Sequence, residues 1–324
     1  MSPEPTSAQP TGADAVPDRH GDNLYRADPD LSRLLALYLP PDLDTHLAPH
    51  LDRLGALAGG ELDDLAGTAD RNPPVLRHRT RRGEDRQSIA YHPAYRRLEQ
   101  VAFGQTLIAL PLMQRQLAKM LVRAEQARSM MLQTAEALRR SDLGEPGAYA
   151  LLRILTPLLK FRACRDARGV TGDAMEVRGG VGYIEEWPDA RLLRDAHLGS
   201  IWEGTSNIVA LDVLRAASRE GALEALSAHV RGLLDASDQH EGLRDAFHRA
   251  VALAMTATTT PVLARQAASG LYHVTSAAAL AWEAPRLADP RRHALARMVL
   301  RHRVLPRDPL DAGGADDLAI VMEG

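Results

Sequence analysis

Residues 175–215 read MEVRGGVGYIEEWPDARLLRDAHLGSIWEGTSNIVALDVLR, and they combine two features that loops of random composition rarely combine. The first is a glycine-rich turn of Gly179, Gly180 and Gly182, where the backbone can adopt positive φ angles and approach a ligand closely. Such a turn is by itself more typical of a helix end. No strand precedes it and no βαβ unit surrounds it, so it is not a Rossmann fingerprint.

The second feature is the turn Glu203-Gly204-Thr205-Ser206, which opens a predicted helix at Asn207. Thr205 or Ser206 can cap that helix, and the N-terminus of a helix can bind a phosphate. Glu203 is a candidate functional carboxylate, although a surface carboxylate beside a helix start is electrostatically favourable and equally expected. The residues alone leave both interpretations open.

The chain on both sides of this segment predicts helices. Apolar residues recur at spacings of three and four, β-branched residues never gather into alternating runs, and aromatic residues make up only 4%. Helices are predicted at about residues 31–39, 43–59, 94–110, 111–140, 145–167, 220–236, 240–256, 261–284 and 289–303. The predicted fold class is all-α: a C-terminal helical bundle with a short N-terminal helical region and no β-domain.

Composition also predicts where the chain divides. Residues 1–28, rich in Pro, Asp, Ser and Gly, are expected to be a disordered tail. Residues 29–100 form the predicted N-terminal helical region, with a polar, arginine-rich loop at 71–88. Residues 101–305 form the predicted C-terminal helical domain, and 306–324 a loose tail.

Several classes of protein are disfavoured. The formal net charge of -3 gives no overall nucleic-acid or membrane signature. The single cysteine, Cys164, excludes a disulfide framework and a zinc cluster, and the histidines lack metal-ligand spacing. Because neither a leader nor an apolar run of about 18 residues is found, we expect a cytoplasmic protein.

The motifs together resemble a known family. IWEGTSNI, with MEVRGGVGYIEE and RLLRDAHLGS, resembles the C-terminal domain of the acyl-CoA dehydrogenase family of flavoproteins. PLMQRQLAKM and ILTPLLKF resemble the same domain, particularly in its AidB-like (alkylation-response) branch. ADRNPPVLRHRTRRG and YHPAYRRL resemble the N-terminal helical domain of that branch. The resemblance to the C-terminal domain covers roughly residues 101–300.

This resemblance implies an FAD-dependent oxidoreductase that acts on an acyl-CoA thioester. Glu203 stands where many members carry the base that removes the acyl α-proton, after which the β-hydride passes to the flavin. A carboxylate suits that role only in a desolvated site. The implied FAD-binding residues are Phe103, Gly179, Gly180, Gly182, Thr205, Ser206 and Asn207. In this family the glycine loop often reaches across a subunit interface, so a homo-oligomer is expected.

Three departures from the family pattern stand out. Gln100 replaces an arginine that usually contacts the pyrophosphate, and Glu176 replaces a glutamine. The third departure is the middle β-domain, which is expected to be missing at a join near residues 98–102. Without it the flavin would be exposed and Glu203 solvated, and a solvated carboxylate is a poor base for a carbon acid.

Two alternative functions follow from these features. One is a non-catalytic helical scaffold, or an oligomerisation partner of a full-length paralogue. The other is nucleic-acid binding through a basic stretch, in which Arg297 and Arg301 are spaced to share a helix face. Its candidate residues are Arg286, Arg291, Arg292, Arg297 and Arg301. A solvated basic face explains that stretch more simply, because no aromatic residues are interleaved with it.

Overall fold

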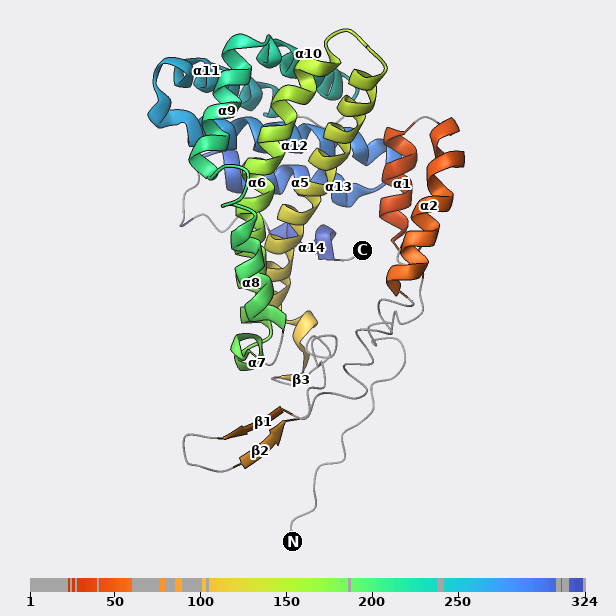
Figure 1. Cartoon of the computed structure of the whole chain (residues 1–324), viewed down its shortest axis with the longest axis vertical. Helices are drawn as coiled ribbons and strands as arrows, with labels where there is room; N and C mark the ends of the chain where they lie inside the picture. The colour runs from red at the N-terminus through yellow and green to blue at the C-terminus, as the bar shows by residue number, and fades with distance from the viewer. Residues whose placement is uncertain are drawn as a thin grey trace. The chain divides into compact units, whose positions relative to one another are not determined.

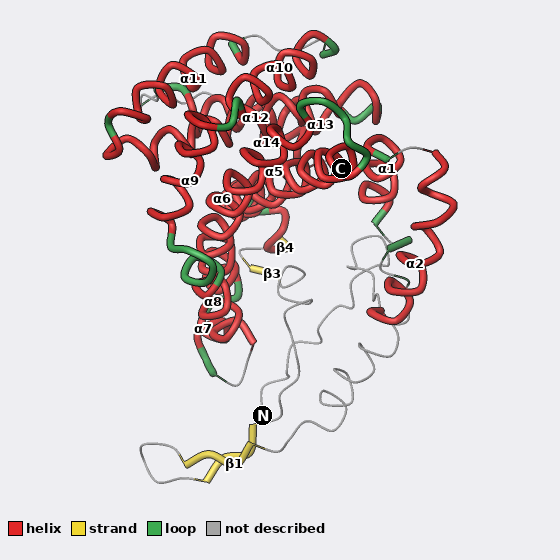
Figure 2. Tube along the Cα trace, turned by 45° about the horizontal axis from the view of Figure 1, so that its top comes forward, coloured by secondary structure: helices red, strands yellow, loops and turns green. Residues whose placement is uncertain are grey.

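The computed structural model describes residues 23, 25–26, 28–39, 41–59, 76–79, 85–88, 101–102, 105–185, 188–237, 242–306, 310 and 315–322. Helices account for nearly all of this described chain, as Figure 2 shows. The predicted all-α fold class is confirmed. The chain divides into two units, residues 30–45 with 115–324, and residues 1–29 with 46–114.

The larger unit is a helical bundle organised on two long helices (Figure 1). These are α5 (Pro111–Asp142), most of which belongs to this unit, and α6 (Ala148–Val177). Gly144 and Gly147 in the turn between them have φ angles of 73° and 78°, which glycine adopts without steric cost. The other elements are α1 (Pro29–Tyr38), α7 (Gly180–Tyr183), α8 (Pro188–Leu198), α9 (Ser206–Arg219), α10 (Ala222–Asp235), α11 (Leu243–Thr259), η2 (Pro261–Leu263), α12 (Ala264–Leu287), α13 (Pro290–Val299), η3 (Leu300–Val304) and α14 (Ala315–Met322).

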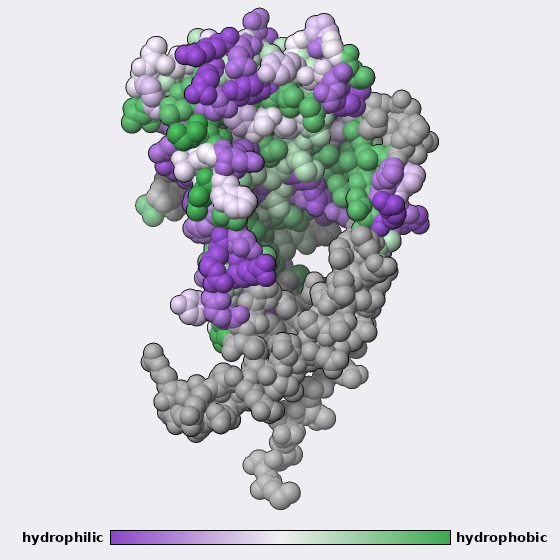
Figure 3. Space-filling model, viewed as in Figure 1, coloured by the Kyte–Doolittle hydropathy of each residue, from purple (hydrophilic) through white to green (hydrophobic). Residues whose placement is uncertain are grey.

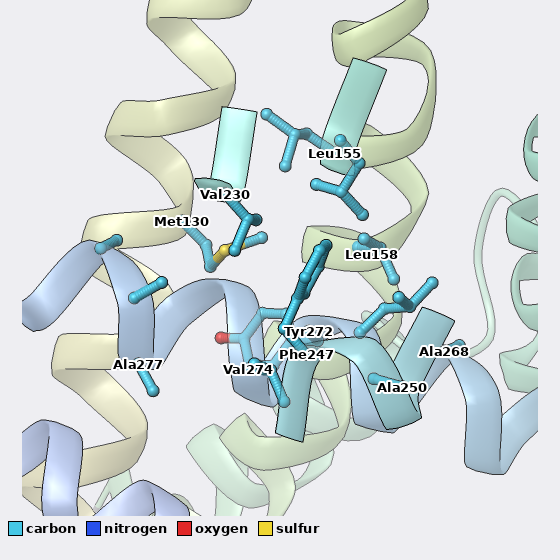
Figure 4. Packing of buried hydrophobic residues seen from close by; sticks show 14 of the residues in the cluster. Met130, Leu155, Leu158, Val230, Phe247, Ala250, Ala268, Tyr272, Val274 and Ala277 are labelled. Atoms are coloured by element: carbon cyan, nitrogen blue, oxygen red, sulfur yellow. The ribbon is translucent and has the colours of Figure 1, made fainter. Parts of the chain in front are cut away.

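The core of the bundle is built around α12. This helix is buried along nearly its whole length, and its many alanines let neighbouring helices approach closely. Figure 4 shows Tyr272 of α12 among Phe247 of α11, Leu158 of α6 and Val274. The helix predicted at 145–167 lies deep in the bundle, since Ile154, Leu155 and Leu158 are fully buried.

Helix α6 runs ten residues beyond its predicted end at 167. Two glycines lie in this extension, and each faces a side chain of a neighbouring helix. A Cβ at Gly169 would lie 2.7 Å from a guanidinium nitrogen of Arg123, and one at Gly172 would touch Leu193. Packing against α5 and α8 therefore outweighs the low helix propensity of glycine.

The smaller unit contains residues 46–59 of α2 (Pro41–Gly59). The Asn23 amide donates 2.8 Å hydrogen bonds to the backbone oxygen and a carboxylate oxygen of Asp52, and Arg26 pairs with the same carboxylate. A Cβ at Gly55 would lie 2.3 Å from Asn23 Oδ1, so this approach requires glycine. Residues 1–22 of the predicted disordered tail lie outside the described residues.

Two pairs of short strands were not predicted. β1 (Leu76–Arg79) pairs antiparallel with β2 (Asp85–Ser88), within the segment predicted to be a polar loop. Their sequences, LRHR and DRQS, lack the apolar alternation that marks a strand. β3 (Val101–Ala102) pairs with β4 (Gln105–Thr106), followed by the short helix η1 (Leu107–Ala109).

The helix predicted over 94–110 is therefore wrong for the described residues 101–102 and 105–110. Leu110 has an extended backbone, with ψ 127°, because the following Pro111 disfavours the helical region for the residue before it.

The tail predicted to be loose after residue 305 instead includes α14. Its side chains Leu318, Ile320, Val321 and Met322 pack against the main core. Arg297 donates a 2.8 Å hydrogen bond to Asp317, which fixes the helix to α13. The sequence pattern is too short to reveal this helix, and burial against the bundle stabilises it. Across the described chain, no helix is both long and apolar enough to cross a membrane.

Candidate functional site

Glu203 lies in the turn between α8 and α9, next to Lys160 of α6. The Lys160 ammonium donates a 2.8 Å hydrogen bond to the backbone oxygen of Trp202 and lies 4.0 Å from a Glu203 carboxylate oxygen. Because α6 continues to Val177, Lys160 is a mid-helix residue, and its side chain holds the Glu203 turn.

The Glu203 backbone is in the left-handed region, with φ 53°, where residues other than glycine are uncommon. Gly204 follows at φ 105°, and a Cβ there would lie 3.3 Å from Ile208. Two consecutive positive φ angles turn the chain sharply into α9. Such strained positions cluster at functional sites.

The Glu203 side chain is 88% exposed, and the side chains around it are apolar and also exposed. Trp202 is 65% exposed, and Ile201 and Ile208 are each 59% exposed. The expectation that Glu203 is solvated in this chain agrees with this geometry. A carboxylate surrounded by uncovered apolar side chains becomes desolvated only when a further surface covers them.

Thr205, Ser206 and Asn207 occupy the N-terminus of α9. Thr205 is the N-cap residue, and its side chain makes no capping hydrogen bond. Val209 donates its backbone N–H to the Thr205 carbonyl, as the first turn of a helix requires. The side chain of Asn207 is exposed and that of Ser206 half-buried, so donors at the positive end of a 14-residue helix face outward.

The glycine-rich segment links α6 to α8 through α7. Gly179 has φ 66°, and a Cβ at Gly182 would lie 2.4 Å from the backbone oxygen of Met175, so both positions require glycine. Gly180 is different, because a Cβ there would meet no atom within 4 Å. The backbone at Gly180 is therefore open to an approaching group.

Polar side chains anchor this segment. The buried Arg178 pairs with the buried Asp189 at the start of α8. Gln116 donates a 3.3 Å hydrogen bond to the Glu176 carboxylate, so that carboxylate has a partner in α5. Figure 3 shows hydrophilic residues over the outer face of α8.

Within one chain the two motifs are not brought together. α8 separates the glycine segment from the Glu203 turn, and its 11 residues span about 16 Å. Phe103 lies outside the described residues. A pocket of about 290 Å³ lies elsewhere, lined by Ser227, Arg231, Phe247, His248, Val251 and Ala252. Its lining includes none of the predicted site residues, and among the described residues no three potential ligands gather to hold a metal.

The five arginines considered for nucleic-acid binding do not form one basic face. Arg292 is only 2% exposed, and its guanidinium forms ion pairs of 2.9 Å with Glu125 and 3.0 Å with Glu283. A side chain that neutralises two buried carboxylates cannot contact a phosphate backbone.

The other four arginines are also largely engaged. Arg291 pairs with Asp30 and Asp289, Arg297 pairs with Asp317, and Arg286 stacks on Trp282 at 4.3 Å. Arg301 alone of the five has no such partner among the residues that the structure describes. It lies in the π-helical turn η3, so the expected α-helical spacing from Arg297 is not kept. The periodic pattern treated 289–303 as a surface helix, whereas α13 packs between α12 and α14.

Comparisons with known proteins agree with these motifs. The family "Acyl-CoA dehydrogenase, C-terminal domain" matches residues 89–218, and the family "Adaptive response protein AidB N-terminal domain" matches residues 14–141. The two matched stretches overlap, so no residues lie between them.

Individual relatives point the same way. The putative acyl-CoA dehydrogenase AidB of Escherichia coli is 37% identical over 141 residues, which is 43% of this chain and 25% of that protein. Acyl-CoA dehydrogenase family member 11 of Caenorhabditis elegans is 41% identical over 142 residues, which is 42% of this chain and 22% of that protein. The chain thus corresponds to about a quarter of the length of these relatives.

Solved structures extend the likeness to the fold. The structure of Caenorhabditis elegans ACDH-11 in complex with C11-CoA matches 66% of this chain and 41% of its own, with a TM-score of 0.59 and 27% identity. An acyl-CoA dehydrogenase of Bacillus anthracis, complexed with FAD, shares the fold at 14% identity and a TM-score of 0.51, over 70% of this chain and 43% of its own. Over the matched residues 14–218, the chain therefore belongs to the AidB-like branch of the acyl-CoA dehydrogenase family.

Proposed function

We propose that this chain takes part in an FAD-dependent, acyl-CoA dehydrogenase-like oxidation, in which hydrogen is removed from the α and β carbons of an acyl-CoA thioester. The observation that carries the proposal is the strained turn at Glu203. It holds a carboxylate between Lys160 and the N-terminus of α9. By resemblance, this is the position at which many family members carry the catalytic base.

The residues present fit a flavin dinucleotide at two places. At the N-terminus of α9, the side chain of the N-cap residue Thr205 makes no capping hydrogen bond. Together with Ser206 and Asn207 it offers outward-facing donors suited to a phosphate. At Gly180 the backbone is open to a flat or extended group. Because α8 separates these places, they would serve two different FAD molecules, each shared with a second protomer.

The chemical roles then divide as follows. Bound FAD would accept the β-hydrogen as hydride. Glu203 would take the α-proton on its carboxylate, and Lys160 would hold the turn that aims it, through the Trp202 carbonyl. Trp202, Ile201 and Ile208 would exclude water from that carboxylate once they are covered, which strengthens it as a base.

Flavin uptake and reduction test this proposal. Purified protein is titrated with FAD while flavin fluorescence and absorbance are recorded, and an acyl-CoA series is then added without an electron acceptor. We expect FAD to bind and its absorbance near 450 nm to fall with a suitable thioester. Glu203→Gln should bind FAD as tightly yet be reduced about 100-fold more slowly or worse.

Glu224→Gln provides the matched control, because Glu224 is an exposed glutamate in the first turn of α10. It should behave like the unmodified protein. No flavin uptake by the protein, or equal reduction rates for Glu203→Gln and Glu224→Gln, would contradict the proposal.

A second candidate function is a non-catalytic helical scaffold that pairs with another member of the family. The uncovered apolar side chains around Glu203 favour it, since they need a partner surface whether or not chemistry takes place. The same titration separates the two, because a scaffold would assemble without taking up FAD.

A further inference from the structure

The pocket of about 290 Å³ lies between the consecutive helices α10 and α11, which pack against each other (Figure 2). Its volume is at the low end of the range of roughly 300–1,000 Å³ that is usual for ligand sites. Its lining consists of Ser227 and Arg231 of α10 and Phe247, His248, Val251 and Ala252 of α11. None of these residues belongs to the motifs assigned to flavin or thioester, and both helices lie beyond residue 218, where the match to the family's C-terminal domain ends.

An ion pair joins the two helices at one end of the pocket. Arg244, in the first turn of α11, donates a 2.8 Å hydrogen bond to Asp235 at the end of α10, so the helices run antiparallel. Arg231 lies about one turn before Asp235 on α10. On α11, His248 lies about one turn after Arg244, and Ala252 about one turn further. The polar part of the lining is therefore next to the ion pair, and the pocket continues away from it.

The lining carries a cation and no acid. Arg231 and His248 are exposed, and neither forms a hydrogen bond or an ion pair with another residue that the structure describes. Asp235, the nearest acid to Arg231 along α10, already accepts the hydrogen bond from Arg244. The five N–H donors of the Arg231 guanidinium are thus open to an acceptor from solution, and the ring of His248 adds a donor from the other helix.

The rest of the lining is apolar apart from one hydroxyl. Phe247 is buried and belongs to the main core, Val251 is half-buried, and Ala252 is exposed at the rim. The Ser227 hydroxyl donates a 2.7 Å hydrogen bond to the backbone oxygen of Leu223, so its proton is not available to a ligand. A ligand that matches this pocket therefore presents an apolar body to the phenylalanine and an acceptor to the arginine.

We propose that this pocket binds a small monocarboxylate with an apolar body, with the carboxylate at Arg231 and His248 and the body over Phe247. A guanidinium group and a carboxylate match in shape and can form two parallel hydrogen bonds. Arg231 is the only formal charge in the lining when histidine is counted as neutral, so one carboxylate balances it and a doubly charged phosphate does not. The small volume restricts the body to one aromatic ring or a short alkyl chain. The proposal does not depend on flavin binding or on Glu203.

Fluorine NMR of 4-fluorobenzoate, titrated with the purified protein, tests the site. The matched neutral probe is 4-fluorobenzamide, which has the same ring and no charge. We expect saturable binding of the acid, and binding of the amide that is about tenfold weaker or worse because the charge-assisted contact is lost. Competition by hexanoate separates the two kinds of body: tighter binding than 4-fluorobenzoate identifies an alkyl chain, and weaker binding identifies an aromatic ring. Both of these outcomes support the site.

Two variants locate the bound acid. Arg231→Gln removes the cation and Ala252→Trp fills the pocket, and both positions are exposed, so neither substitution removes a buried side chain. The matched controls are Arg249→Gln and Ala228→Trp, at exposed positions of the same two helices that do not line the pocket. Arg231→Gln should bind 4-fluorobenzoate about tenfold more weakly and 4-fluorobenzamide as before. Ala252→Trp should bind neither probe, and both controls should bind like the unmodified protein.

Three results would overturn the proposal. The first is no saturable binding of either 4-fluorobenzoate or hexanoate to the unmodified protein. The second is equal affinity for the acid in Arg231→Gln and Arg249→Gln, which would show that the guanidinium group of Arg231 does not contact the carboxylate. The third is unchanged binding in Ala252→Trp, which would place the ligand elsewhere on the protein. Circular dichroism confirms that each variant is folded, and Arg231→Gln decides the outcome by itself if Ala252→Trp does not fold.

Discussion

At the scale of single residues, the most consequential group is a buried ionic network inside the larger unit. Glu283 is 0% exposed and accepts hydrogen bonds from Tyr38 at 2.5 Å and Ser129 at 3.0 Å, in addition to its ion pair with Arg292. Burial raises the pKa of Glu283, and the charge of Arg292 counteracts that rise. The carboxylate thus depends on its partners to stay ionised.

Removing the cation from this network should be severe. Arg292→Met leaves Glu283 and Glu125 without their shared partner, and we expect it to lower the free energy of unfolding by about 3–5 kcal/mol. Urea denaturation followed by circular dichroism measures this, with Arg301→Met as the exposed control. A loss below about 1 kcal/mol, which is typical of surface substitutions, would contradict the view that the buried carboxylates depend on Arg292.

A second residue-scale prediction concerns pH. Burial, and then the charges of Arg162 and Arg303, lower the pKa of His273 to about 3, so this histidine is neutral in the fold. Its ring nitrogen Nδ1 lies 3.1 Å from the Gln126 amide. In the unfolded chain this histidine binds a proton near pH 6.5, and in the folded chain it does not. The contribution of His273 to stability is therefore fully present above pH 6.5 and is lost as the pH falls below that value.

Between pH 6 and 4, His273 should make the free energy of unfolding fall by up to about 1.4 kcal/mol for each pH unit. Glu283 acts in the opposite direction, because its raised pKa favours the fold at low pH. The measurement is therefore a comparison: urea midpoints from pH 4.5 to 7.5 for the unmodified protein and for His273→Phe. The urea midpoint of His273→Phe should fall less steeply as the pH is lowered. Parallel curves for the two proteins would contradict the assignment of this loss to His273.

At the scale of elements, α1 illustrates attachment by polar contacts. Tyr38 at its end reaches the buried network, where Gln133 of α5 donates a 2.8 Å hydrogen bond to its hydroxyl. At its start, Asp30 accepts a 3.0 Å hydrogen bond from Arg291. Leu34 is buried between these two contacts, in a small cluster with Tyr38, Leu132 and Leu287.

Tyr38→Phe should therefore loosen α1 more than it destabilises the bundle. Loss of the hydroxyl leaves Glu283 and Gln133 each without one buried hydrogen-bond partner. We expect this to lower the free energy of unfolding by about 1–3 kcal/mol. In the Tyr38→Phe variant, hydrogen exchange followed by mass spectrometry should speed up more in residues 30–38 than in α10. Tyr149→Phe, at an exposed position of α6, is the control and should leave exchange in α1 unchanged.

At the scale of the whole molecule, the exposed apolar side chains around Glu203 form a surface that a partner could cover. We expect this surface to bury itself in an assembly of protomers, which would also desolvate the carboxylate. Light scattering of the purified protein should give a mass above one protomer. Ile208→Glu should shift this mass toward that of the monomer, whereas Val262→Glu, at a more exposed position on η2, should not. A monomer for the unmodified protein at all concentrations would contradict this.

Much of the fold could be predicted from helical periodicity. The long apolar stripes of α5 and α6 predict helices, because apolar residues at spacings of three and four lie on one face of a helix and can be buried together. Short elements could not be found this way. The strand LRHR and the helix α14 carry too few residues for a pattern, and contacts with distant segments decide them.

The candidate site divides in the same manner. The sequence by itself determined the family, the all-α class and the motif that contains Glu203, because those depend on residue identity and spacing along the chain. Only the tertiary structure decided that Lys160 holds the Glu203 turn, that α8 keeps the two motifs apart, and that Arg292 is buried in an ion pair with Glu283. The physical reason is that burial and charge balance are set by which helices pack together, and one-dimensional spacing does not specify them.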